Sequence, residues 1–330
     1  MKTAILGAGS WGTDLAWLWG RDGREISLWG NTAHRVARIQ KTRENSDCLP
    51  GLMLPESVRI TSELRDCADA DLIVFATPSI ALRRVATGLR EVVRITRAVF
   101  LSCTKGIEYG TWMRMSQILD EIFPGRKISV LSGPNLAAEV TKNLPTATVV
   151  GCNDLDCAAD LQKFLGSRRF RIYTSRDVAS IELGGALKNV FAIAAGISDG
   201  LGLGDNSKAA LVTRSLAELI RLGVAMGGNV HAFYGLSGAG DLVLTCYSEQ
   251  SRNYTVGKRL GRGETPAQIA ASMKMVAEGI STTRSTYECA GRLNIDTPII
   301  DQVYAMLYDQ KRPTVALEEL LQREQKSEQA

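Results

Sequence analysis

Residues 3–13 read Thr-Ala-Ile-Leu-Gly-Ala-Gly-Ser-Trp-Gly-Thr, and this stretch decides the fold. Its apolar start predicts a buried strand, and the residues from 11 to 20 predict a helix. Gly7, Gly9 and Gly12 lie between the two with GxGxxG spacing, which is typical of a turn that binds a dinucleotide. Gly7 permits the tight turn, Gly9 lets a pyrophosphate approach the backbone, and Gly12 lets the helix pack on the sheet. The N–H groups at the start of the helix then face the phosphates.

The same alternation continues through the first half of the chain. Short apolar and β-branched runs predict strands at 3–6, 26–29, 71–76, 98–101, 128–131, 146–150 and 170–173. Amphipathic stretches between them predict helices at 11–20, 32–43, 79–90, 111–122, 135–142 and 153–165. Repeated βαβ units build a mostly parallel, doubly wound sheet, so we expect a Rossmann-like α/β dinucleotide-binding domain over residues 1–177.

After Asp177 the pattern changes to long helical periodicity with glycine-rich breaks. Helices are expected at 181–197, at 207–222, after 251, after 266, at 282–293 and at 299–307. The second half is therefore predicted to be an all-α C-terminal domain over residues 178–330, which carries substrate and catalytic residues.

The composition fits a soluble protein of two domains. Of the 330 residues, 45% are hydrophobic and 22% are charged. The net charge of +4, without a basic run, is poor evidence for nucleic acid as a partner. No apolar run approaches the roughly 20 residues that span a bilayer, so no stable membrane insertion is expected. Seven cysteines without CxxC spacing indicate reduced thiols and a cytoplasmic location.

Histidine is too scarce for two common kinds of active site. His34 and His231 are the only histidines, and neither has the spacing of a metal site. We expect no metal cofactor and interpret both as ordinary surface or capping residues. Proton transfer in this protein must therefore use another group.

The second predicted strand lacks the acidic residue that holds the ribose 2′-hydroxyl of NAD in many dinucleotide-binding folds. It runs instead into Trp29-Gly30-Asn31-Thr32, so nothing repels a 2′-phosphate. We therefore expect NADP, or both NADP and NAD, as the cofactor. Arg35 would attract the phosphate, although a solvated helix charge is the more ordinary interpretation of this residue.

Two segments follow strands at the edge where open α/β sheets place ligands. They read Ser-Cys-Thr-Lys-Gly-Ile-Glu at 102–108 and Ser-Gly-Pro-Asn-Leu-Ala-Ala-Glu-Val at 132–140. We expect Lys105 and Asn135 to point into the crevice at this edge. Taken singly, Lys105 would be an ordinary surface cation and Gly-Pro an ordinary turn.

Lys188 stands in an unusually apolar predicted helix. Gly184 and Gly185 lie one turn before it and leave room for a ligand on its face. A partly desolvated lysine has a lowered pKa, which suits general acid/base catalysis. The alternative is a lysine whose ammonium group snorkels to the helix edge.

Asp241 and the segment 251–253 complete the set of chemically informative residues. The glycine-rich segment before Asp241 is interpreted as a bend that presents this carboxylate to a small ligand. Ser251, Arg252 and Asn253 open a further helix, and their guanidinium, amide and N–H groups suit a phosphate monoester. On its own, Ser251 would be a plain helix N-cap.

Together these residues resemble the bacterial-type NAD(P)-dependent sn-glycerol-3-phosphate dehydrogenase family. The resemblance covers essentially the whole chain and rests on GAGSWGT at 7–13, TPS at 77–79, TKGIE at 104–108, SGPNLAAEV at 132–140, ELGGALKNV at 182–190, GLSGAGDLVLTC at 235–246, SRN at 251–253 and VAEG at 276–279. It implies the NAD(P)H-dependent, reversible reduction of dihydroxyacetone phosphate to sn-glycerol 3-phosphate. This product is the backbone precursor of glycerophospholipids, and such enzymes are commonly homodimers.

The resemblance also implies roles for residues at matching positions. Lys188 matches the catalytic acid/base, which protonates the carbonyl oxygen as hydride arrives, and Asp241 would orient the lysine or the substrate hydroxyl. Substrate-contact positions are Lys105, Gly133, Asn135, Asp241, Ser251, Arg252 and Asn253. Cofactor-contact positions are Ser10, Trp11, Asn31, Lys105, Ala137, Arg252, Val276 and Glu278, beside the glycines Gly7, Gly9 and Gly12.

Some residues depart from the family pattern. Asn135 replaces the commoner Ser or Thr, and Asn31 leaves the cofactor preference open. Asp14, Trp17 and Trp19 lie in a first helix that is usually more apolar. Two other functions stay open from the residues alone: reduction of a non-phosphorylated hydroxy acid or ketoacid with Arg252 on a carboxylate, and NAD(P)H sensing without turnover.

Overall fold

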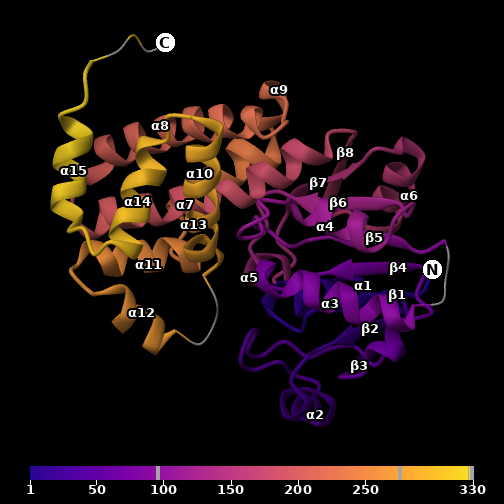
Figure 1. Ribbon diagram of the computed structural model, residues 1–330. Helices are drawn as coiled ribbons and strands as arrows, with labels where there is room; N and C mark the ends of the chain where they lie inside the picture. The colour runs from indigo at the N-terminus through magenta and orange to yellow at the C-terminus, as the bar shows by residue number, and fades with distance from the viewer. Residues whose placement is uncertain (94–96, 274–276, 326, 328–330) are drawn as a thin grey trace.

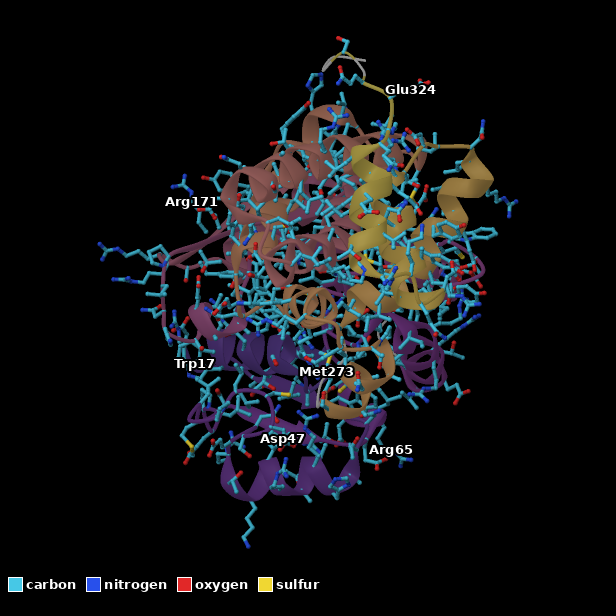
Figure 2. The ribbon with its side chains drawn as sticks, turned by 90° about the vertical axis from the view of Figure 1, so that its left-hand side faces the viewer. Trp17, Asp47, Arg65, Arg171, Met273 and Glu324 are labelled. Atoms are coloured by element: carbon cyan, nitrogen blue, oxygen red, sulfur yellow. The ribbon has the colours of Figure 1, made fainter. Side chains whose placement is uncertain are left out.

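The computed structural model describes residues 1–93, 97–273, 277–325 and 327. It has two parts, which Figure 1 shows side by side: a sheet part, coloured indigo to magenta, and a helical part, coloured salmon pink to yellow. Trp17 and Asp47 mark the sheet part in Figure 2, and Glu324 lies at the opposite end of the molecule. The two predicted fold classes are therefore confirmed, in the predicted order.

The sheet has eight strands in the order β3-β2-β1-β4-β5-β6-β7-β8. Their bounds are β1 Thr3–Leu6, β2 Ile26–Trp29, β3 Val58–Thr61, β4 Leu72–Phe75, β5 Val99–Ser102, β6 Ile128–Ser132, β7 Thr146–Cys152 and β8 Phe170–Ser175. Thr3 of β1 pairs with Ile26 on one side and with Leu72 on the other, both in parallel register. Only the β6–β7 pair is antiparallel among these strands. The strand order reverses beside β1, so the carboxyl ends of β1 and β4 border a crevice where ligands bind in such sheets.

Helices cover both faces of the sheet. They are α1 Ser10–Gly20, α2 Ala33–Thr42, α3 Ser79–Val92, α4 Met115–Ile122, α5 Ala137–Val140 and α6 Leu155–Leu165. Along β1 the side chains alternate: Ile5 packs with α1, α2 and α6, whereas Leu6 packs with α3 and α4. Both faces are thus buried, which explains the nearly continuous apolar strands of the sequence.

The unusual polar and aromatic residues of α1 have structural partners, with one exception. The Trp19 indole donates a hydrogen bond to the Leu165 carbonyl at the end of α6 (3.1 Å). The Arg21 guanidinium lies over the Trp17 ring. Asp14 is fully buried, and neither of its carboxyl oxygens has a hydrogen-bond partner among the described residues. Burial raises its pKa to about 8, and the charge of Arg21 opposes this shift.

The helical part begins with α7, Val178–Gly200, whose N-cap is Asp177 at the predicted boundary between the domains. The other elements are α8 Gly204–Ala225, α9 Val230–Phe233, the π-helical turn η2 Leu236–Gly240, α10 Asp241–Tyr247, α11 Arg252–Gly261, α12 Pro266–Ser272, α13 Glu278–Leu293, α14 Pro298–Tyr308 and α15 Pro313–Leu321. The domain boundary itself stays a prediction.

The expectation that no apolar run has the length of a membrane span was wrong for α7. By length and composition alone, this helix of 23 residues is apolar enough to cross a bilayer. Within the fold, 89% of its apolar window is buried because the other helices surround it. Such a helix is the ordinary core of a helical domain.

Helices α7 and α11 pack backbone against backbone. A Cβ atom on Gly196 would lie 2.1 Å from the carbonyl oxygen of Tyr254, and one on Gly257 would lie 1.9 Å from that of Ile193. Only glycine fits at these two positions without moving the helices. This close approach fixes the start of α11 beside the middle of α7, where Lys188 lies.

The unpartnered Asp14 predicts a dependence of stability on pH. Because its folded pKa of about 8 exceeds the ordinary aspartate pKa of 3.8, the unfolded chain releases this proton at a lower pH than the folded chain. Its contribution to stability is full below about pH 4 and is lost as the pH rises to about 8, by up to about 1.4 kcal/mol per pH unit. Urea unfolding between pH 5 and 8 should show a steeper loss for the wild type than for Asp14→Asn. Parallel curves for the two proteins would contradict the assignment.

Candidate active site

A cavity of about 450 Å³ lies where the carboxyl ends of the strands meet the helical part. The loops after β1, β2, β4, β5 and β6 form one wall, and α7, α10, α11 and α13 contribute to the other. Most of the predicted site residues line it: Gly7, Gly9, Ser10, Trp11, Asn31, Lys105, Asn135, Lys188, Asp241, Ser251, Arg252, Asn253 and Glu278. The fold thus brings residues from both halves of the sequence into one crevice.

The turn between β1 and α1 fits a dinucleotide. Gly7 has a φ of +125°, and a Cβ atom at Gly12 would lie 1.9 Å from the Gly7 carbonyl oxygen, so the helix packs tightly on the turn. At Gly9, by contrast, a Cβ atom would meet nothing within 4 Å. Gly9 is the N-cap of α1 and supplies no side-chain cap. The start of α1 is therefore open for a pyrophosphate to approach its backbone.

After β2 the chain carries a cation, Arg35 in the first turn of α2, and no carboxylate lies between them. Arg35 lines the cavity, and its side chain is 29% exposed, so it is not simply a solvated helix charge. Its Nη2 contacts the Asn45 amide oxygen (3.0 Å) and the Cys48 sulfur (2.6 Å), while Nε lies 3.6 Å from Asp47. These contacts hold the guanidinium in the wall of the cavity, which Asn31 also lines.

Two lysines share one buried carboxylate at the other end of the cavity. Asp241, at the start of α10, is 1% exposed. Its Oδ2 lies 2.5 Å from the Lys105 Nζ, and its Oδ1 lies 3.0 Å from the Lys188 Nζ. Lys105 belongs to the sheet part, whereas Lys188 and Asp241 belong to the helical part. The carboxylate therefore joins the two parts at the point where their chemistry meets.

Lys188 is poised to exchange a proton. Its pKa is lowered to about 8: burial has the largest effect, the charge of Asp241 opposes it, and the charge of Lys105 adds to it. Its Nζ also donates a hydrogen bond to the Thr245 hydroxyl (2.6 Å), which in turn donates one to the backbone carbonyl of Asp241 (2.6 Å). The expected desolvated lysine is thus present, and it does not reach solvent by snorkelling.

Thr245 was missed by the sequence analysis. It lines the cavity and contacts Lys188 directly. The signal was available, because Thr245 lies four residues after Asp241 and so falls on the same face of a helix. The segment was interpreted as a bend, however, and α10 itself was not predicted.

The start of α11 lies across the cavity from the sheet. Ser251 is the N-cap of α11, and its hydroxyl accepts from the Tyr254 N–H, so the plain capping role holds. The Asn253 amide donates to the Asn189 amide oxygen (2.9 Å) and accepts from the Gly279 N–H (2.9 Å). Asn253 therefore bridges α7, α11 and α13. Arg252, the first residue of α11, also lines the cavity.

Glu278 reaches across to the sheet part. One carboxylate oxygen accepts a hydrogen bond from the Ser79 hydroxyl (2.5 Å), and both oxygens face the Ser79 N–H at the start of α3 (3.3 and 3.4 Å). Burial raises the pKa of Glu278, and the charge of Arg252 opposes this shift. Glu278 thus caps a helix of the other domain, a role that no sequence pattern indicated.

Three predicted residues, Gly12, Gly133 and Ala137, lie outside the cavity wall. Gly12 packs α1 on its turn, and the Gly133 carbonyl accepts a hydrogen bond from Lys105 (3.1 Å). Ala137 begins α5, directly after Leu136 of the wall. Val276 lies outside the described residues. Within the described part of the chain, no group of three or more His, Cys, Asp or Glu side chains is placed to hold a metal ion.

Comparison with known proteins assigns both halves of the chain. The family model described as NAD-dependent glycerol-3-phosphate dehydrogenase N-terminus matches residues 2–158, and the corresponding C-terminus model matches residues 177–318. Glycerol-3-phosphate dehydrogenase (NAD(P)+) of Syntrophotalea carbinolica is 45% identical over 99% of both chains. The enzyme of the same name from Geobacter metallireducens is 44% identical over 99% of this chain and 98% of its own. The crystal structure of glycerol-3-phosphate dehydrogenase from Coxiella burnetii has a TM-score of 0.94 at 36% identity, over 98% of this chain and 99% of that one.

The open face at Gly9 predicts a separation of binding from stability. Gly9 has a φ of −85°, which alanine adopts without strain, so Gly9→Ala should change the free energy of unfolding by less than about 0.5 kcal/mol. The added methyl group occupies the approach of the pyrophosphate, so the Kd for NADPH in a fluorescence titration should rise about tenfold or more. Gly12→Ala is the matched control, which should destabilise the fold. Unchanged NADPH affinity in Gly9→Ala would show that the cofactor lies elsewhere.

Proposed function

The chain belongs to the NAD-dependent glycerol-3-phosphate dehydrogenase family, and we propose that it reduces dihydroxyacetone phosphate to sn-glycerol 3-phosphate with Lys188 as the proton donor. The observation that carries this proposal is the buried Lys188, whose pKa of about 8 is set between burial and the Asp241 carboxylate. NAD(P)H, when bound, supplies the hydride. The overall reaction is reversible.

Lys188 supplies the proton that the reduction requires. A ketone that accepts a hydride becomes an alkoxide, and an ammonium group beside its oxygen protonates it as the charge develops. The neutral amine takes the proton back when the alcohol is oxidised. Thr245 and Asp241 hold the Nζ atom from two sides, which leaves its third N–H for the substrate oxygen.

Positive charge in the crevice suits a phosphorylated substrate. Among the residues that the structure describes, four cations line the cavity, Arg35, Lys105, Lys188 and Arg252, against two carboxylates, Asp241 and Glu278. We propose that Arg252, with Ser251 and Asn253 at the start of α11, binds the substrate phosphate, because a guanidinium forms bidentate hydrogen bonds to phosphate. Gly133 and Asn135 would contact the rest of the substrate from the sheet side.

The proposal extends to the metabolic role, the location and the oligomeric state of the enzyme. The product would supply glycerophospholipid synthesis, the enzyme would act in the cytoplasm, and two copies would form a homodimer. The family assignment and the buried α7 support a soluble enzyme. The family assignment favours the phosphorylated substrate over a ketoacid and favours turnover over simple NAD(P)H sensing.

The lowered pKa of Lys188 predicts opposite pH profiles for the two directions. Reduction needs the ammonium form, so its kcat should fall as the pH rises through about 8. Oxidation of sn-glycerol 3-phosphate needs the neutral amine, so its kcat should rise over the same interval.

Lys188→Ala should lower turnover by about 10²- to 10⁴-fold with NADPH affinity retained. Steady-state rates from pH 6 to 10 provide the measurement.

Lys188→Arg is the matched control for this experiment. It keeps the positive charge beside Asp241, but a guanidinium does not deprotonate in this pH range. It should therefore remain inactive in the oxidation of the alcohol. A Lys188→Ala enzyme with near-normal turnover would rule out the proposed role.

The position of Arg35 predicts a preference for NADPH. Arg35 and Asn31 both line the cavity, and no carboxylate stands between β2 and Arg35 to bind a ribose 2′-hydroxyl. Arg35→Ala should lower kcat/KM for NADPH about tenfold or more and change that for NADH by less than about threefold. Arg38→Ala, on the same helix but outside the cavity wall, is the control. An equal loss with both cofactors would contradict a contact to the 2′-phosphate.

A further inference from the structure

Thr148, in β7, is a fully buried residue that contacts Asn135 in the wall of the cavity. Its hydroxyl donates a hydrogen bond to the Ser132 carbonyl (2.9 Å) and accepts one from the Asn135 amide nitrogen (3.0 Å). No sequence motif singled it out, and it does not line the cavity. Asn135, which it holds, does line the cavity.

These two hydrogen bonds fix the orientation of the Asn135 amide. A threonine hydroxyl has one proton, and here that proton goes to the Ser132 carbonyl. Thr148 can therefore only accept from Asn135, so it binds the amide NH₂ group and turns the amide oxygen away. That oxygen, Oδ1, is buried and has no hydrogen-bond partner among the described residues. A buried acceptor of this kind calls for a donor from the ligand.

The loop that carries Asn135 is held at the reacting centre. Gly133 has a φ of +150°, and a Cβ atom there would lie 3.0 Å from the Thr148 Cα atom. The Gly133 carbonyl accepts from the Lys105 Nζ, which also binds Asp241. Thr148 thus supports one side of the loop, and the two-lysine carboxylate cluster supports the other.

The substrate offers a single group that satisfies this acceptor. In dihydroxyacetone phosphate, the ketone oxygen and the phosphate dianion only accept hydrogen bonds, and the primary hydroxyl is the one donor. We infer that Thr148 is a positioning residue that orients the Asn135 amide oxygen to accept from the substrate's primary hydroxyl, and thereby makes the enzyme select hydroxymethyl ketones. This inference rests on the proposed function.

The consequence is a discrimination that a purely apolar wall would not provide. A site built to bind a hydroxyl rejects the analogue without it strongly, because its own polar group then stays buried and unpaired. Acetonyl phosphate is the matching probe: it keeps the ketone and the phosphate, and a methyl group replaces the hydroxymethyl group. The wild-type kcat/KM should favour dihydroxyacetone phosphate over acetonyl phosphate by at least about a hundredfold.

The test compares four variants on both substrates at saturating NADPH. Thr148→Val keeps the shape of the side chain and removes the hydroxyl, so kcat/KM for dihydroxyacetone phosphate should fall about tenfold or more, with less than about threefold change for acetonyl phosphate. Thr148→Ser keeps the hydroxyl and should behave as the wild type. Asn135→Ala should lose the same discrimination. The double variant Asn135→Ala/Thr148→Val should match Asn135→Ala, because Thr148 acts through Asn135. Thermal melting confirms that each variant is folded.

Each alternative has a distinct result. Equal losses on both substrates in Thr148→Val, or additive losses in the double variant, would show a merely structural role and overturn the inference. A raised KM for NADPH with unchanged discrimination would assign the amide oxygen to the cofactor's carboxamide and also overturn it. If the wild type does not reduce dihydroxyacetone phosphate with either cofactor, the proposed function itself fails. Turnover by the wild type with unaltered discrimination in the variants would leave the proposed function standing alone.

Discussion

The Asp241 carboxylate, buried between two lysines, is the interaction on which the rest of the site depends. One oxygen holds Lys105 of the sheet part and the other holds Lys188 of the helical part. Without this carboxylate, two positive charges would lie together in a buried crevice, which is strongly unfavourable. Asp241 therefore aligns the two domains and keeps the Lys188 pKa from falling below about 8. Domain assembly and proton transfer rely on the same atoms.

The packing of the helices and the alignment of the strand ends place the other site residues around this carboxylate. The close packing of α7 and α11 at Gly196 and Gly257 places the start of α11 opposite the sheet. The parallel strands end at one edge, so the loops with Lys105 and Asn135 reach the cavity together. Glu278 adds a second link between the domains by capping α3 at Ser79. Polar contacts thus join the two parts of the molecule at Asp241 and at Glu278, and the cavity that the two parts form is available to ligands.

Features of the structure that follow a repeating residue pattern, or that combine distinctive residue types, could be predicted from the sequence. Alternating strands and helices, the glycine turn and the apolar helix around Lys188 all have local patterns, and the structure has each of them. Strand β3 was missed because it is a four-residue edge strand with an exposed Arg59. The roles of Thr148 and Glu278 had no local signal, since their partners lie 13 and 199 residues away. Such contacts exist only once the chain has folded.

The most direct test of the central claim is the titration of Lys188 itself, followed by NMR in protein labelled with ¹³C at lysine Cε. Comparison with Lys188→Ala assigns the signal. The account predicts that Lys188 titrates near pH 8, and that Asp241→Asn lowers this pKa because the carboxylate no longer stabilises the ammonium form. A Lys188 signal that titrates above pH 10, or one that Asp241→Asn leaves unchanged, would contradict the claim.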